Sequence, residues 1–206
     1  SILGRQAKAL ARKERSQTRT ANGREFGSLL RACASAKAHY STRSESNRGR
    51  HMTETERTLS DVQTLAWAEL YLQAGFWLLP IWGVDSGETD LSCRCRVPGC
   101  PSPAKHPIGS LVPRGLNDAS NQISNVTAWL RSWPGCNLAV ATGRGSNLWV
   151  LDVDPQHGGE LALEELGLEW PATVTVSTGG GGRHIWWRYP AVDREVASRN
   201  NALGAG

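Results

Sequence analysis

The sequence has no continuous apolar run close to the roughly eighteen residues that a membrane-spanning helix needs. Its first residues are too basic, and too poor in continuous apolar sequence, to form a secretory signal. No internal repeat is apparent, and methionine occurs once, as Met52. These absences favour a cytoplasmic protein without a membrane segment. The length of 206 residues fits one medium domain, with or without a tail.

Acidic residues are scarce in the first quarter of the chain. Residues 1–51 hold 12 Lys and Arg but 3 Asp and Glu, whereas the remaining 155 residues hold 11 and 16. High positive charge with few large apolar residues predicts a basic, disordered leader over residues 1–51. The alternative is an arm that binds nucleic acid, because clustered Lys and Arg release counterions from phosphates. We expect the globular domain to span residues 52–206.

Cysteine is infrequent, and three of the five cysteines lie close together. With one histidine they make the pattern C-x-C-x4-C-x5-H, and three thiolates with one imidazole suit a tetrahedral Zn²⁺ ion. Such a cluster favours a reducing compartment and a closed structural zinc site over a disulfide framework. The alternative is a cysteine-containing loop without metal. The predicted zinc ligands are Cys93, Cys95, Cys100 and His106.

The spacing of apolar residues predicts a chain of helices and strands. Predicted helices cover residues 60–74, 121–133 and 159–166, and predicted strands cover residues 76–84, 137–141, 148–154, 172–177 and 184–189. Ser60 and Gln63 match a capping box that would begin the first helix, and Gly75 would end it. This order of elements indicates an α+β domain with a mixed, largely antiparallel sheet and flanking helices. Cys136 is expected to be a buried free thiol.

Two carboxylates close the predicted strand 148–154. Because side chains alternate along a strand, Asp152 and Asp154 should point to the same side, with Cα atoms about 6.6 Å apart. Two carboxylates in this position suit one or two hard cations such as Mg²⁺. The alternative is that Asp152 ends the strand and Asp154 opens a turn with Pro155. His157 is interpreted as a solvent-facing turn residue rather than as a third metal ligand.

Four consecutive glycines separate the last two predicted strands. Such a run is costly inside a strand, but it lets main-chain N–H groups approach a phosphate closely. His184 follows the run directly, where a ring nitrogen could reach the same phosphate. The alternative is a flexible hairpin loop with an incidental histidine. Together, the carboxylate pair, the glycines and the histidine predict a site for a metal ion and a triphosphate.

These two segments, Asp152-Val153-Asp154 and residues 177–184, resemble the first two motifs of the archaeo-eukaryotic primase superfamily. The sequence is more similar to the bifunctional primase–polymerase (prim-pol) domains of phages, prophages and plasmids. The resemblance covers about residues 59–206 and includes segments 105–107, 115–119 and 139–143. It implies a catalytic half similar to the RNA-recognition-motif fold. Similar cysteine clusters occur in actinobacterial prim-pol relatives, which favours the zinc interpretation.

The resemblance also implies roles for individual residues. Asp152 and Asp154 would hold Mg²⁺ or Mn²⁺, and His184 would contact the triphosphate of the incoming nucleotide. The nucleotide-binding residues beside His184 would be Ser177, Thr178, Gly179, Gly180, Gly181 and Gly182. The family's third motif, an acidic residue on a later strand, is not found in the sequence. We expect it after Gly206, so that the domain would be truncated at its C-terminus.

The leading hypothesis is a replication nucleotidyltransferase, a DNA primase and DNA polymerase that makes primers or extends DNA. Its expected partners are a DNA template and primer, nucleoside triphosphates, and a fused or separate helicase. The expected origin is bacterial, with a gene carried by a phage or prophage. One alternative is a non-catalytic nucleotide- or DNA-binding remnant of a prophage. A metal-dependent nuclease is a third hypothesis, which fits the carboxylate pair but leaves the glycines and the histidine unexplained.

Overall fold

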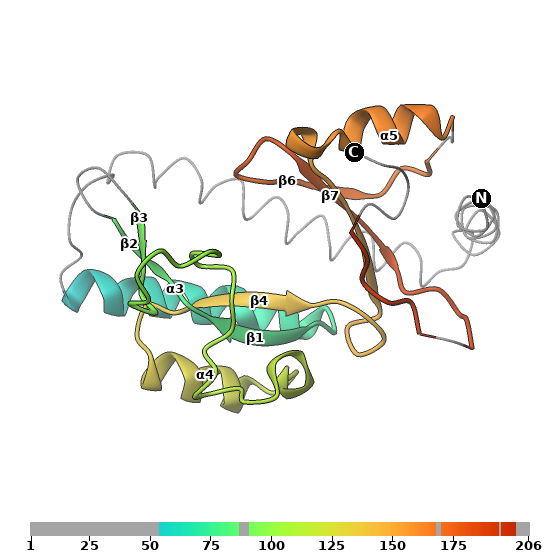
Figure 1. Ribbon diagram of the computed structural model, residues 1–206. Coiled ribbons are helices and arrows are strands. Elements are labelled where there is room, and N and C mark those ends of the chain that lie inside the picture. The colour runs from blue at the N-terminus through green and yellow to red at the C-terminus, as the bar shows by residue number, and fades with distance from the viewer. Residues whose placement is uncertain (1–53, 87–90, 168–169, 194, 201–206) are drawn as a thin grey trace. The chain divides into compact units, whose positions relative to one another are not determined.

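The computed structural model describes residues 54–86, 91–167, 170–193 and 195–200 (Figure 1). The chain divides into two compact units. The helical unit comprises the described residues up to Ser146, and the sheet unit comprises those from Asn147 onward. The predicted leader lies outside the described residues, so its disorder stays a prediction. Within the described part of the chain, no helix is long and apolar enough to cross a membrane.

The helical unit is built on two short antiparallel ladders and two helices. Its elements are α3 (Glu54–Gln73), β1 (Trp77–Ile81), β2 (Val84–Ser86), β3 (Leu91–Cys93), the 3-10 helix η2 (Gly115–Asp118), α4 (Ile123–Ser132) and β4 (Asn137–Ala141). β1 pairs with β4 and β2 pairs with β3. Helices α3 and α4 pack against each other and against β1 (Figure 1). The β2–β3 ladder places Cys93 opposite Val84, so the first predicted zinc ligand ends a strand.

The core of the helical unit forms where β1 meets the helices, and it includes Leu78, Leu79, Ile108, Val126 and Leu130. Pro80, the fourth of the five residues of β1, is also buried. The N–H groups of Leu78 and Trp82 donate to loop carbonyls rather than to β4. The backbone N of Pro80 lies on the same edge of β1 as these two N–H groups, which is the edge away from β4. Its missing N–H therefore costs no hydrogen bond of the β1–β4 ladder.

Helix α3 begins six residues before the predicted start at Ser60. Ser60 therefore lies inside the helix, and the predicted capping box is wrong. The added segment contains two glutamates and an arginine, which are good helix formers. Gly75, with a φ of +87°, ends the helix as predicted, because this backbone conformation strains residues that carry a Cβ atom. The predicted strand 76–84 is also divided, since β1 ends at Ile81.

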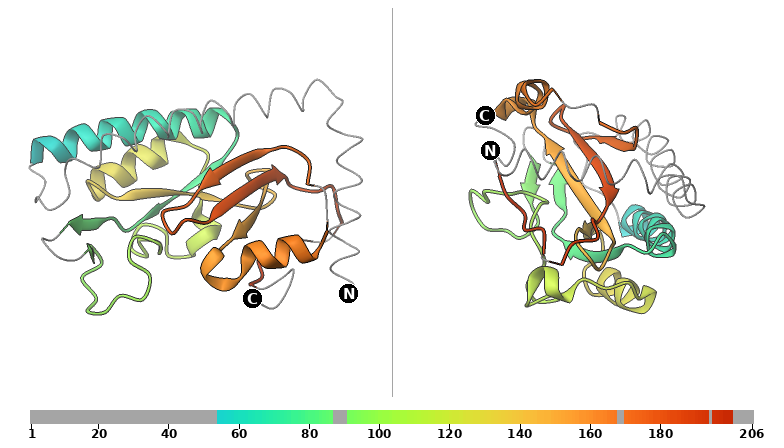
Figure 2. Two further views of the ribbon diagram at one scale, coloured as in Figure 1. Left: turned by 90° about the horizontal axis from the view of Figure 1, so that it is seen from above. Right: turned by 90° about the vertical axis from the view of Figure 1, so that its right-hand side faces the viewer.

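The sheet unit contains one three-stranded antiparallel sheet in the order β5-β7-β6. Its elements are β5 (Leu148–Val153), the 3-10 helix η3 (Pro155–His157), α5 (Gly159–Glu165), β6 (Val174–Ser177) and β7 (Arg183–Arg188). Val153, Ile185 and Trp187 are buried on one face of the sheet, where Leu163 of α5 packs against them. Figure 2 shows α5 beside one end of the strands of this sheet. Alternation along the strands then leaves Asp152 and His184 on the opposite face.

The α+β class, with small antiparallel sheets and flanking helices, is confirmed. The strands predicted at 137–141 and 148–154 both form, but they belong to different ladders, because β4 pairs with β1. Helix α4 forms within the predicted range 121–133, with Val126, Trp129 and Leu130 buried. Cys136 is 4% exposed and free, as predicted.

Candidate functional site

Asp152 and His184 face each other across strands β5 and β7, where they are paired in the register. His184 Nε2 lies 3.5 Å from Asp152 Oδ1, and the two side chains are 41% and 67% exposed. This distance is longer than a normal N–H···O hydrogen bond. The two groups are therefore close enough to act on one ligand, and both remain accessible to it.

Asp154 lies just beyond β5 and opens the turn that follows. Its backbone is still extended, with a φ of −100° and a ψ of 113°, so its side chain falls on the side of Asp152. Its Oδ1 accepts a hydrogen bond of 2.9 Å from Gln156 N, as the N-cap of η3. Asp154 therefore lies on the same side of the strand as Asp152 and also opens the following turn, so the two interpretations do not exclude each other.

The glycine run forms a closed hairpin loop between β6 and β7. Thr178 N donates to Gly182 O at 2.8 Å, and Gly181 N donates to Thr178 O at 3.1 Å. Gly181 has a φ of +84°, which only glycine adopts readily. By contrast, Gly179 and Gly180 are exposed, and their N–H groups make no hydrogen bond within the described part of the chain. Two main-chain donors are therefore open to a ligand at the tip of this loop.

Two glycines let neighbouring segments approach the end of β5. A Cβ atom on Gly182 would lie 2.5 Å from Val153 O, and one on Gly159 would lie 2.7 Å from Asp154 N. Gly159 N also donates to Asp154 O at 2.9 Å. The hairpin loop and the start of α5 therefore fix the backbone of the strand end that carries both carboxylates.

Arg183 and Glu160 form an ion pair that sequence analysis did not predict. Arg183 Nε lies 3.0 Å from Glu160 Oε1, and Arg183 Nη2 lies 2.5 Å from Glu160 Oε2. This fork joins the first residue of β7 to the first turn of α5. The two residues are 23 positions apart, and no local pattern links them. The only sequence signal is a glutamate at the start of a predicted helix, which is too common to identify a partner.

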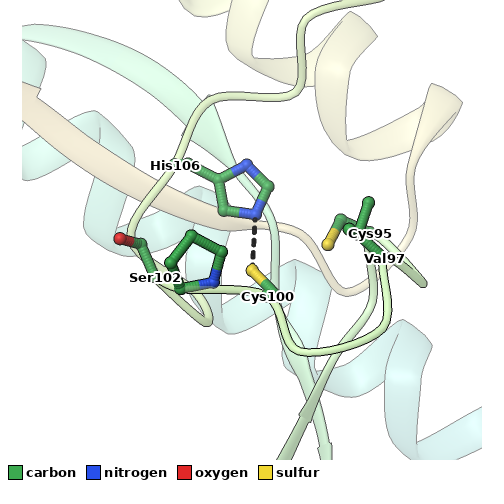
Figure 3. A pocket seen from close by; sticks show the side chains of 6 residues that line it. Cys95, Val97, Cys100, Ser102 and His106 are labelled. Carbon is green, nitrogen blue, oxygen red and sulfur yellow. Dashed lines mark hydrogen bonds between the residues drawn. The ribbon is translucent and has the colours of Figure 1, made fainter.

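The four predicted zinc ligands come together in the helical unit. Their ligand atoms all lie within 4.8 Å of one another, and His106 Nε2 is 3.4 Å from the Sγ atoms of Cys93 and Cys100. Figure 3 shows the imidazole of His106 directed at Cys100, with Cys95 beside them. Among the described residues, this is the only group of three or more Cys, His, Asp or Glu side chains that meets so closely.

The protonation of the cysteines is uneven. Burial raises the pKa of Cys93, but hydrogen bonds from the backbones of Ala104 and Cys95, and from the side chains of Cys95 and His106, lower it to about 6. The backbone N–H of Val97 lowers the pKa of Cys95, yet burial and the neighbouring thiols of Cys93 and Cys100 raise it above its ordinary value. Three adjacent thiols cannot all ionise without a cation, so this donor set fits a bound metal ion.

The loop that carries the cluster has an unusual backbone. Arg96 and Ala104 have φ values of 59° and 57°, in the left-handed region that strains residues with a Cβ atom. Arg94 Nη1 donates to Pro134 O at 2.8 Å, so its guanidinium fastens the loop to the rest of the helical unit. The loop is therefore held in place by the hydrogen bond of Arg94 and by the close approach of the three cysteines and His106.

Comparison with known proteins gave one family match. A family model described as "Bifunctional DNA primase/polymerase, N-terminal" matches residues 68–205. Searches among curated proteins and among solved structures each found no significant match. The matched segment contains the carboxylate pair, the glycine hairpin, His184 and the cysteine cluster.

Proposed function

Because the chain belongs to the bifunctional DNA primase/polymerase N-terminal family, we propose that it transfers nucleotides to DNA in a metal-dependent reaction. The products would be primers, or DNA extended from a primer, and the substrates nucleoside triphosphates. The observation that carries this proposal is the pairing of Asp152 with His184 across β5 and β7. That pair lies beside Asp154 and beside a glycine loop with two open N–H donors.

The carboxylates suit divalent cations. Asp152 and Asp154 are 67% and 47% exposed, and their oxygens are the ligands that Mg²⁺ and Mn²⁺ prefer. When bound, such ions would activate the primer 3′-hydroxyl and stabilise the charge of the triphosphate and its leaving group. The protein's part is to hold two carboxylates on one face at a fixed spacing, which the extended backbone from Asp152 to Asp154 does.

The phosphate contacts would come from the opposite strand and its loop. His184 would donate from a ring nitrogen to a phosphate oxygen, since it stands across from Asp152 and remains accessible. The N–H groups of Gly179 and Gly180 would add two main-chain donors to the same negative charge. Ser177 and Thr178 border this loop on its β6 side. No single side chain is identified as a general base.

The cysteine cluster would hold Zn²⁺ as a structural ion. Three thiolates and one imidazole complete a tetrahedral set, which leaves no open position for a substrate. In this proposal the ion fixes the loop from Cys93 to His106. It takes no part in nucleotide transfer.

A second candidate function is nucleotide or DNA binding without catalysis. Among the described residues, Asp152 and Asp154 belong to no group of three or more Asp, Glu, His or Cys side chains whose ligand atoms all lie within 4.8 Å of one another. Two carboxylates without a third would bind the metal ions more weakly. The chain would then hold a triphosphate at the glycine hairpin without incorporating it.

The test that separates these functions combines incorporation with binding. The chain would be incubated with a primed DNA template, Mn²⁺ and labelled deoxynucleoside triphosphates, and a parallel sample would receive a chelator. Primer elongation that the chelator abolishes supports the polymerase. Metal-dependent binding of the triphosphate without any elongation supports the binding protein. The absence of both elongation and triphosphate binding would reject both candidate functions.

A further inference from the structure

His157 lies in the turn that follows β5 and makes hydrogen-bond contacts with Asp154. Its ring Nδ1 lies 2.9 Å from Asp154 Oδ2, and its backbone N–H donates to Asp154 O at 3.2 Å. Gln156 N donates to the other carboxylate oxygen at 2.9 Å. Both carboxylate oxygens of Asp154 are therefore oriented by donors within three residues of it. The sequence-based interpretation of His157 as a solvent-facing turn residue captured its exposure, 74%, but not this contact.

The two carboxylates differ in how firmly they are held. Asp152 is 67% exposed, and His184 Nε2 lies 3.5 Å from its Oδ1. Asp154 carries two hydrogen bonds of 2.9 Å on its two oxygens. Both carboxylate oxygens of Asp154 are thus oriented by hydrogen bonds, and its side chain is still 47% exposed.

We propose that His157 is a positioning residue, which fixes the orientation of the Asp154 carboxylate for binding of the divalent cation. This inference rests on the proposed function, because it takes Asp154 as a metal ligand. His157 acts through Asp154 and touches neither substrate nor metal. Donors that orient a ligating side chain commonly change metal affinity by about 10- to 100-fold when they are removed.

The contact makes a conservative substitution informative. A carboxylate only accepts hydrogen bonds, so Nδ1 of His157 must be the donor. The side-chain nitrogen of asparagine is bonded to Cγ, as Nδ1 of histidine is, and it can donate from nearly the same position. His157→Asn therefore keeps the hydrogen bond, whereas His157→Ala removes it. Because the pair is exposed, neither change should affect stability much.

The test measures Mn²⁺ affinity directly, by following the paramagnetic resonance signal of free Mn²⁺ during titration of the zinc-saturated chain. Asp154→Asn defines the part of the binding that depends on Asp154. The matched control is Gln156→Ala, which keeps the backbone N–H that Asp154 accepts from. We expect about tenfold weaker Mn²⁺ binding in His157→Ala. We expect affinities close to the wild-type value in His157→Asn and Gln156→Ala, with all melting temperatures nearly equal.

The possible failures are distinguishable. Wild-type Mn²⁺ affinity in His157→Ala, together with weakened binding in Asp154→Asn, would overturn the positioning role and leave Asp154 as a metal ligand. Equal loss in His157→Asn and His157→Ala would overturn the hydrogen-bond explanation. Wild-type affinity in Asp154→Asn would overturn the metal assignment of the proposed function, and the role of His157 with it.

Discussion

Gly182 lies against the carbonyl oxygen of Val153, so closely that an added Cβ atom would come within 2.5 Å of it. No Cβ atom tolerates such a contact with backbone, so one of the two segments would have to move. We predict that Gly182→Ala shifts the glycine hairpin away from β5. Triphosphate affinity should then fall by about tenfold, equivalent to roughly 1.4 kcal/mol. Equilibrium titration with a labelled nucleoside triphosphate and Mn²⁺ would measure it.

Gly179 provides the matched control for this prediction. It lies in the same loop, but a Cβ atom there would meet open space. Gly179→Ala keeps the backbone N–H and should bind the triphosphate nearly as the wild type does. If Gly182→Ala bound as tightly as Gly179→Ala, the loop would not depend on its approach to β5, and the glycine hairpin would lose its place in the proposed site.

The cysteine cluster predicts one zinc ion per chain. Cys95→Ser should remove a thiolate ligand and lower the free energy of unfolding by about 4 kcal/mol, since loss of a metal site is among the largest single-residue effects. Metal analysis of the purified chain and thermal unfolding would check both statements. Ser102→Ala, in the same loop but outside the ligand set, should leave the zinc content and the melting temperature unchanged. A wild-type chain without zinc would refute the site.

Cys136 predicts a change of stability at high pH. Burial raises the pKa of its thiol from 9.0 to about 11, and the nearby Asp61 carboxylate adds to the effect. The folded state therefore keeps the proton more tightly than the unfolded state. The contribution of the protonated Cys136 thiol to the free energy of unfolding is complete below pH 9 and is lost as the pH rises toward 11.

Chemical unfolding at pH 8 and at pH 10.5 would test this prediction against Cys136→Ala. The wild type should lose about 2 kcal/mol more than the variant over this interval. Cys136 should also resist alkylation in the folded chain at pH 8, as mass spectrometry of the digested protein would show. Equal pH dependence in the two proteins would mean that the thiol is not protected by burial.

The features that sequence predicted correctly depend on short-range patterns. Asp152 and Asp154 were expected on one side of the strand because side chains alternate along an extended backbone. This alternation requires only a few consecutive extended residues. The cysteine cluster was predictable because its members lie within fourteen residues of one another in the sequence. Gly75 and its positive φ ended the first helix for an equally local reason.

The features that sequence missed depend on tertiary contacts or on competing local signals. Arg183 and Glu160 meet because β7 lies beside β5 and α5 follows β5, and neither fact is visible in their own neighbourhoods. The start of α3 was misplaced because Ser60 offered a plausible cap inside a longer helix-forming segment. The contact between Asp154 and His157 did have a local signal. Asp154 is the N-cap of the 3-10 turn that begins with Pro155, and His157 is the third residue of that turn.

The most direct test of the central claim is the Mn²⁺-dependent extension of a labelled primer by the wild-type chain and by Asp152→Ala. The control is Asp193→Ala, which removes an exposed carboxylate of the sheet unit outside the site. The account predicts that Asp152→Ala loses at least about a hundredfold in extension rate, with an unchanged melting temperature and zinc content. Asp193→Ala should extend like the wild type. Extension by Asp152→Ala at the wild-type rate would contradict the assignment of this carboxylate to the metal.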